Sequence, residues 1–242
     1  MLNKCICTVY DAGLDNIVYY CFHVAGLLLA LANALNDAKH LGIKLWKALI
    51  AVLIVYPLIY ELRYAIRWVE RIFYDCSGAN IIKAFVFMPA VIWPVAKMLK
   101  VEQGKINQLF AVIPCIGQGI SHLGCVFPGC CQGYEAAWGI YNCRLACTCI
   151  PVQIFEAISA LLIGLYLEMR FRRHNWQDDR KAMPIMFVLF GLSRFLLEFL
   201  RNNDKVFLNI SNPALHCLVM ALTGAIWLTA IKKQEKKSHG EI

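Results

Sequence analysis

Residues 213 to 231 read PALHCLVMALTGAIWLTAI, a run without Asp, Glu, Lys or Arg. A helix rises about 1.5 Å per residue, so a helix over this run is long enough to cross the hydrocarbon core of a bilayer, which is about 30 Å thick. A helix also satisfies its backbone hydrogen bonds within one segment, as lipid requires. The run therefore predicts a transmembrane helix.

The rest of the chain continues this apolar pattern. Of its 242 residues, 60% are hydrophobic and 17% are charged, with a mean hydropathy of +0.55; soluble domains carry about 25% charged residues. Seven apolar runs have the length of a span: residues 15–35, 43–62, 81–98, 108–126, 151–169, 183–200 and 213–231. We expect an all-α fold: a polytopic membrane helix bundle of about seven transmembrane helices, forming a single transmembrane domain over residues 1–242.

The basic residues indicate an orientation for these spans. Lys and Arg are concentrated in the loops after the first, third and fifth runs and at the C-terminal end. The positive-inside rule places that side in the cytoplasm, which predicts an outside N-terminus, a cytoplasmic tail at 232–242 and an outer-face loop within 119–150. The net charge of +8 is then charge beside anionic lipid, and no nucleic-acid partner is needed to explain it.

Six of the twelve cysteines fall between residues 125 and 149. The chain lacks the paired C-x-x-C spacing of many zinc sites, so no metal is predicted. Cys130 and Cys131 are adjacent, and they could pair with Cys147 and Cys149 across the loop. We favour packed free thiols, because free cysteine behaves as a small apolar residue. A metal site and one or more disulfides stay open as alternatives.

The same loop is rich in glycine. Gly124, Gly129 and Gly133 lie in HLGCVFPGCCQG, residues 122 to 133. Irregular backbone at membrane depth is tolerated only against protein or a water-filled cavity. We therefore expect this segment to line a site near the outer leaflet. The alternative is a simple turn that ends the fourth helix.

An arginine lies inside the sixth apolar run. Phe190, Arg194, Glu198 and Arg201 are spaced four, four and three residues apart, which places them on one helical face. A charged side chain at this depth is expected to face the bundle interior with a partner, and Glu198 is the partner one turn away. Since guanidinium groups match phosphate oxygens, we interpret Arg194 as an anion-binding residue. The alternative is an ion pair that only stabilises the packing.

Two polar residues open the fifth run. Gln153 and Glu156 are three residues apart and follow Pro151, a residue suited to a first helical turn. They are predicted to line the same cavity as Arg194, or else to act only as helix caps.

Three motifs in this order resemble the prolipoprotein diacylglyceryl transferase family, over residues 80 to 230. The glycine-rich signature of the family is matched by Ser121 to Cys125 and Gly129 to Gly133. Its P-x-Q-x-Y/F-E motif is matched by Pro151, Gln153, Phe155 and Glu156. Its third motif is matched by Gly191, Arg194, Phe195, Glu198, Phe199, Arg201 and Asp204. The chain resembles a divergent, cysteine-rich member, because His122 replaces the signature arginine and Phe190 replaces a tyrosine.

The resemblance implies a multi-pass protein of the bacterial plasma membrane with its active site toward the outer face. It implies an enzyme without a cofactor that moves diacylglycerol from phosphatidylglycerol to the lipobox cysteine of a preprolipoprotein, among membrane lipids. The implied catalytic residues are Arg194, His122 and Glu198. The implied substrate-binding residues are Gly124, Gly129, Gly133, Gln153, Glu156 and Arg201.

Two alternatives follow from the departures from the family pattern. A divergent member could use another lipid or acceptor, or bind lipid without catalysis. A cysteine-based redox or metal protein of the membrane is the other reading, because six cysteines gather in one loop.

Overall fold

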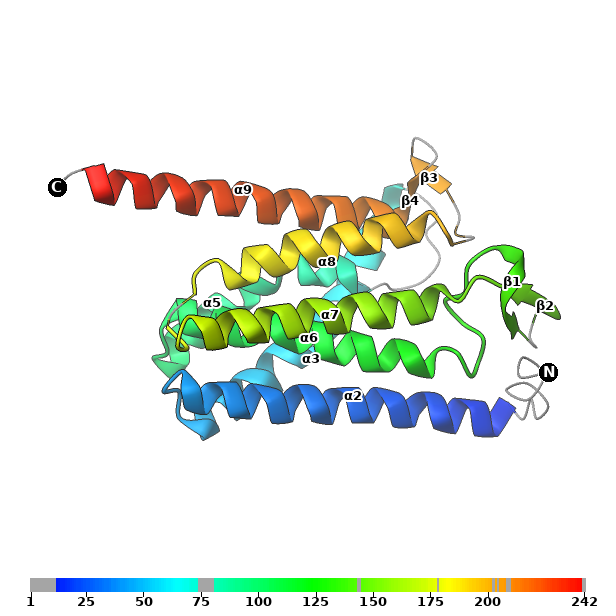
Figure 1. Ribbon diagram of the computed structural model, residues 1–242, viewed down its shortest axis with the longest axis horizontal. Helices are drawn as coiled ribbons and strands as arrows, with labels where there is room; N and C mark the ends of the chain where they lie inside the picture. Colours follow the sequence, from blue (N-terminus) through cyan, green and yellow to red (C-terminus); the bar gives the residue numbers. More distant parts are fainter. Residues whose placement is uncertain are drawn as a thin grey trace.

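The structure is a computed structural model that describes residues 12–73, 81–142, 145–177, 179–201, 203, 205–207 and 210–240. Long helices lie side by side in one bundle, and the start of α2 and the end of α9 lie at opposite ends of it (Figure 1). The helices are α2 (Ala12–His40), α3 (Leu45–Phe73), α4 (Ile82–Phe85), α5 (Met88–Leu99), α6 (Gln103–Gly124), α7 (Val152–Arg173), α8 (Ala182–Glu198) and α9 (Asn212–Gly240).

Every predicted apolar run overlaps one or two helices, and four helices are long and apolar enough to cross a membrane. Within the described residues these four candidate spans are Asn16–His40, Leu45–Ile72, Val152–Arg173 and Asn212–Ser238. Helix α8 has only 17 residues, and α5 has 12. The several apolar helices agree with a membrane protein, while seven crossings and their orientation stay predictions.

The third predicted run is two helices rather than one. Helix α4 ends at Phe85 and α5 begins at Met88. Pro89 occupies the first turn of α5, where its missing N–H is tolerated, but it cannot donate to the carbonyl four residues earlier and so cannot continue α4. The predicted run over 81–98 therefore forms two helices separated by a short turn.

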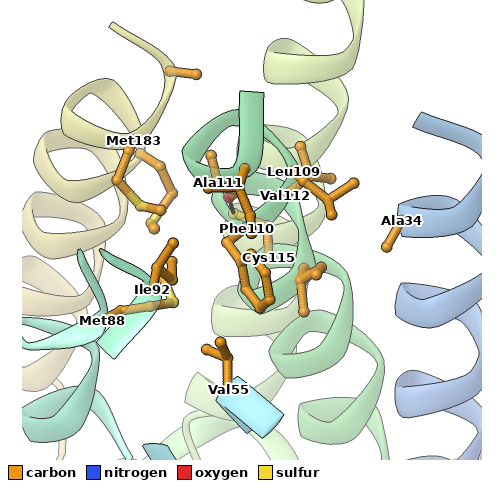
Figure 2. Packing of buried hydrophobic residues seen from close by; sticks show 14 of the residues in the cluster. Ala34, Val55, Met88, Ile92, Leu109, Phe110, Ala111, Val112, Cys115 and Met183 are labelled. Atoms are coloured by element: carbon orange, nitrogen blue, oxygen red, sulfur yellow. Dashed lines mark hydrogen bonds between the residues drawn. The ribbon is translucent and has the colours of Figure 1, made fainter. Parts of the chain in front are cut away.

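Helix α6 lies at the centre of the bundle and packs against α2, α5, α7 and α8. Figure 2 shows its buried residues among side chains of neighbouring helices. The labelled set is Ala34, Val55, Met88, Ile92, Leu109, Phe110, Ala111, Val112, Cys115 and Met183. Since lipid is as apolar as these side chains, close van der Waals packing holds such helices together.

Small residues permit the closest helix contact. A Cβ atom on Gly191 of α8 would lie 2.7 Å from the carbonyl oxygen of Cys217 in α9. A Cβ atom on Gly224 of α9 would lie 2.7 Å from the carbonyl oxygen of Pro184 in α8. Glycine at both positions therefore lets the two backbones approach each other.

Short strands make the fold less purely helical than predicted. Strands β1 (Glu135–Asn142) and β2 (Cys147–Cys149) form an antiparallel sheet, and β3 (Lys205–Phe207) pairs with β4 (Ile210–Ser211). Both sheets lie at the end of the bundle where α2 begins (Figure 1). The predicted outer loop 119–150 thus contains the last turns of α6 and then this first sheet. The fold is helical as predicted, with these two short sheets added to it.

A buried ion pair joins α3 to α4 and predicts a stability effect. Lys83 contacts Glu70, and both side chains are less than a tenth exposed. Glu70 also lies 2.9 Å from His216 of α9. Substituting Lys83→Ala removes one buried partner, which is expected to lower the free energy of unfolding by about 3–5 kcal/mol. Thermal unfolding in detergent measures the loss.

The matched control is an exposed pair. Lys105 lies 3.7 Å from Glu102 within one helical region, and both side chains are a third or more exposed. Lys105→Ala is expected to leave the unfolding temperature unchanged, because solvent-exposed ion pairs contribute about 0–1 kcal/mol. Equal losses in the two variants would contradict a structural role for the buried pair.

Candidate active site

One buried carboxylate contacts two arginines and a histidine of the site. Glu156, near the start of α7, is 1% exposed. Its carboxylate contacts the guanidinium of Arg194 from α8. Its Oε2 lies 2.6 Å from Nη2 of Arg201 and 3.1 Å from Nδ1 of His122, in the last turn of α6. Three segments far apart in sequence therefore meet at this residue.

This arrangement corrects the expected partner of Arg194, which is Glu156 rather than Glu198. Phe190, Arg194 and Glu198 do share one buried helix face, as predicted, but Arg201 lies beyond the end of α8 and not on that face. Glu198, however, stands where α8 ends, and its Oε1 accepts hydrogen bonds from the amide of Asn203 and, at 3.1 Å, from the hydroxyl of Ser211. Hydrogen bonds from the segment between α8 and α9 therefore occupy the carboxylate of Glu198.

The arginines retain unused hydrogen-bond donors. Among the described residues, Nε of Arg194 and Nε of Arg201 are buried and have no hydrogen-bond partner. Buried polar atoms are nearly always paired, so unpaired donors of this kind indicate a missing ligand or water. Guanidinium groups favour carboxylate and phosphate oxygens. The chemistry of the donors therefore fits an anion.

A polar cavity of about 360 Å³ adjoins these donors and is lined by His122, Arg194 and Arg201. His122 thus faces the same cavity as Arg194. Sequence reasoning missed the lining residues contributed by α2 and α3. These are Tyr19, His23, Tyr56, Tyr60 and Arg63.

An apolar crevice continues from the polar cavity. Tyr56, Ile81, Gln118 and Ser121 line both spaces. The crevice is otherwise lined mainly by apolar side chains of α2 to α6, including Leu27, Val55, Ile59, Phe85, Met88 and Phe110. The crevice has a volume of only about 30 Å³, so it offers an apolar contact beside the polar chamber rather than room for a whole hydrocarbon chain.

A second cavity lies beneath the first sheet. Its volume is about 460 Å³, and Cys131, Arg201 and Asn203 line both this cavity and the polar chamber. Tyr134, Glu135, Cys147 and Cys149 also line it. Arg201 therefore stands between two cavities.

The structure explains the three signature glycines by close contacts at Gly124 and Gly133 and by a left-handed backbone at Gly129. A Cβ atom on Gly133 would lie 2.5 Å from the carbonyl oxygen of Leu200, and one on Gly124 would lie 2.7 Å from Cβ of Phe22. Gly129 adopts a φ of +62°, a left-handed value that favours glycine. Gly133 also forms an isolated β-bridge with Arg201, which ties the loop to the site. Of the three, Gly133 lines the second cavity.

The structure does not bring Gln153 to the arginines. Gln153 is buried and lines a small pocket with Val126, Gly129 and Asn142. Glu156, one turn further along α7, is the residue of that motif that reaches Arg194. The two residues share a helix start but lie in different surroundings.

The described cysteines are free thiols, so the pairing of Cys130 or Cys131 with Cys147 or Cys149 is not present. Sγ of Cys147 lies 3.5 Å from Sγ of Cys149 on the same strand. Cys131 is held instead against the end of α6, where hydrogen bonds from the thiols of Cys125 and Cys130 hold its pKa well below the usual value. The free thiols agree with the favoured prediction for this part of the chain.

Comparison with known proteins decides the family. The family model described as prolipoprotein diacylglyceryl transferase matches residues 15–230.

The chain belongs to this family.

Two relatives show how close the similarity is. Phosphatidylglycerol–prolipoprotein diacylglyceryl transferase 2 of Clostridium perfringens is 28% identical over 140 residues, which cover 54% of each chain. Phosphatidylglycerol–prolipoprotein diacylglyceryl transferase of Cereibacter sphaeroides is 33% identical over 92 residues, covering 37% of this chain and 30% of the relative. The match spans about half the length of the first relative and less of the second.

Membership in the diacylglyceryl transferase family confirms the resemblance recognised from the three motifs. With its apolar helices, it identifies the chain as a multi-pass membrane protein of a transferase family. The residues at which the structure converges, Glu156, Arg194 and Arg201, all come from the second and third of those motifs.

Proposed function

We propose that the protein transfers diacylglycerol from phosphatidylglycerol to the thiol of a preprolipoprotein lipobox cysteine. A sulfur–carbon bond forms at the glycerol carbon that bears the phosphate, and the carbon–oxygen bond to that phosphate breaks. Glycerol phosphate leaves, and the thiol proton passes to a base. Family membership and the names of the two relatives support this reaction.

The observation that carries the proposal is the pair of buried arginines with unused donors at the polar cavity. Negative charge develops on the phosphate oxygen as the carbon–oxygen bond breaks. Fixed cationic donors in a water-poor site stabilise such charge strongly. Arg194 and Arg201 would bind the phosphate, and Glu156 would hold both guanidinium groups in place.

The polar chamber fits the charged end of the lipid. The headgroup would occupy this chamber, and the first carbons of an acyl chain would contact the apolar crevice lined by Leu27, Val55 and Phe110. The acceptor peptide would approach through the cavity beneath the first sheet, which meets the chamber at Arg201. Donor and acceptor would thus reach the arginines from different sides.

His122 is the group placed to receive the thiol proton. It faces the chamber, and its Nδ1 lies 3.1 Å from the carboxylate of Glu156. Histidine titrates near neutrality and is a common general base. Glu198 would act as a positioning residue through Ser211 and Asn203.

We further propose that the site faces the outer side of the bacterial plasma membrane. Lys232, Lys233, Lys236 and Lys237 lie near the end of α9, and Figure 1 places that end of the helix away from the two sheets. The positive-inside rule would put these lysines in the cytoplasm. The N-terminus of α2 would then be outside.

A second candidate follows from one departure. His122 stands where the family signature has an arginine, and a weaker grip on phosphate favours a member that binds lipid without transferring it or that uses another donor or acceptor. A member that only binds lipid would release no glycerol phosphate, and one with another acceptor would release it without modifying the lipobox peptide.

The test uses the full protein in phosphatidylglycerol liposomes with a lipobox peptide. We expect glycerol phosphate release that requires both the anionic lipid and the peptide thiol. Phosphatidylcholine liposomes and a peptide with serine in place of the lipobox cysteine are the controls. Lipid bound to intact protein without any release would support the binding role instead.

A further inference from the structure

A histidine and two cysteines gather beside the arginine centre. Their ligand atoms, one nitrogen of His122 and Sγ of Cys125 and Cys131, all lie within 4.8 Å of one another. His122 and Cys125 lie at the end of α6, and Cys131 returns to them from the loop. The set combines imidazole with thiol groups, the ligands that zinc prefers.

The backbone conformation of the loop after α6 places Cys131 beside His122 and Cys125. The amide of Cys130 donates to the carbonyl oxygen of Cys125 at 3.2 Å, closing a turn. Cys131 then adopts a φ of +62°, which is uncommon for a residue with a side chain. A strained conformation persists only where surrounding structure imposes it, and such residues cluster at functional sites.

The surroundings of His122 match a zinc ligand. Its Nδ1 lies 3.1 Å from Oε2 of Glu156, which leaves Nε2 for an ion. A carboxylate on the second nitrogen is the usual support of a zinc-binding histidine. The tetrahedral ligands of zinc, at about 2.0–2.3 Å from the ion, are separated by about 3.3–3.8 Å. Side-chain shifts of about 1 Å would therefore close the site.

The positive charges of Arg194 and Arg201 lie nearby, but they do not prevent zinc from binding. Two thiolates neutralise the two charges of zinc, so the occupied site adds no net positive charge to the arginine centre. The three residues also line the cavity that Arg194 lines. A fourth coordination position therefore faces open space rather than packed protein.

We propose that His122, Cys125 and Cys131 bind one zinc ion whose fourth coordination position faces the chamber lined by Arg194. Three protein ligands and one open position are the pattern of catalytic zinc sites. With zinc bound, Nε2 of His122 is occupied, so the ion would take over the activation that a metal-free His122 would provide: the open position would receive the acceptor thiol, which loses its proton to water as its sulfur binds the ion. This role for the acceptor rests on the proposed transferase function, whereas the metal site itself does not.

The first experiment measures metal content. The full protein, purified without chelators from zinc-supplemented culture, is expected to hold about one zinc per chain. Cys131→Ser and Cys125→Ser are expected to lose it, while Cys115→Ser retains it. Cys115 is a buried thiol on the same helix, and its Sγ donates a hydrogen bond to the carbonyl oxygen of Ala111 one turn earlier. The proposed zinc site would be wrong if the wild-type protein held no zinc after zinc loading. It would also be wrong if all the variants held as much zinc as the wild type.

A variant could lose zinc only because it misfolds, and thermal unfolding distinguishes this case from loss of a ligand. Added zinc is expected to raise the unfolding temperature of metal-stripped wild type and Cys115→Ser, because it binds only the folded state. It is expected to leave Cys131→Ser unchanged. A rise in Cys131→Ser equal to that of wild type would place zinc elsewhere.

The open position is tested with cobalt in place of zinc. Cobalt–thiolate bands are expected to appear in the wild-type spectrum and to shift in a saturable way when a lipobox peptide is added. A serine-containing peptide is expected to cause no shift. No shift with either peptide would overturn the open position, and zinc binding without lipid transfer would contradict only the proposed function.

Discussion

Arg194→Ala is expected to lower the transfer rate by about 10²- to 10³-fold, the loss typical of removing one donor that stabilises developing negative charge. The variant should still fold, since Glu156 keeps its 2.6 Å contact with Arg201. Arg194→Lys is expected to restore part of the rate, because it returns the charge without the forked donors. Initial rates of glycerol phosphate release in phosphatidylglycerol liposomes measure the effect.

The matched control is an arginine at the other end of the bundle. Arg170 of α7 pairs with Asp179 at 2.5 Å, away from the chamber. Arg170→Ala is expected to keep the wild-type rate in protein that remains folded. A wild-type transfer rate in Arg194→Ala would show that Arg194 has no role in the reaction. Equal losses of rate in both variants would indicate a general effect of removing an arginine.

Glu156→Leu is expected to lower the free energy of unfolding by about 3–5 kcal/mol, because it leaves buried guanidinium groups without their counter-charge. Arg194 and Arg201 are 3% and 7% exposed, so water cannot easily replace the carboxylate. Thermal unfolding in detergent measures the loss. Glu235→Leu is the control, since Glu235 forms an exposed pair with Lys181.

A second substitution tests whether the loss arises from the unpaired charges. Glu156→Leu combined with Arg201→Leu removes one of the stranded cations. The double variant is expected to be more stable than the sum of the two single losses predicts, because residues of one buried network are coupled. Strict additivity would show that Glu156 stabilises the fold in some other way.

The helices were predictable because a bilayer demands long apolar runs, and the chain shows them plainly. The break between α4 and α5 was signalled by Pro89, a residue that cannot continue a helix. The first sheet carried no comparable signal. Gly139 in β1 adopts a φ of +132°, and a Cβ there would lie 2.1 Å from the carbonyl oxygen of Cys149, a close approach set by tertiary contact.

The sequence predicted which residues form the candidate site, but not which of them contact one another. Spacing along α8 placed Arg194 and Glu198 on one buried face, as the structure confirms. Spacing cannot show that Arg194 reaches Glu156 on another helix, because that contact depends on how α7 and α8 pack. The meeting of His122, Cys125 and Cys131 likewise depends on a left-handed turn at Cys131 that the sequence does not specify.

The most direct test of the central claim is the mass of the acceptor peptide. A lipobox peptide incubated with the protein in phosphatidylglycerol liposomes is predicted to gain one diacylglyceryl group, with fragmentation locating it on the cysteine sulfur. The gain should depend on Arg194. An unmodified peptide beside folded, lipid-embedded protein would contradict the transferase account of this site.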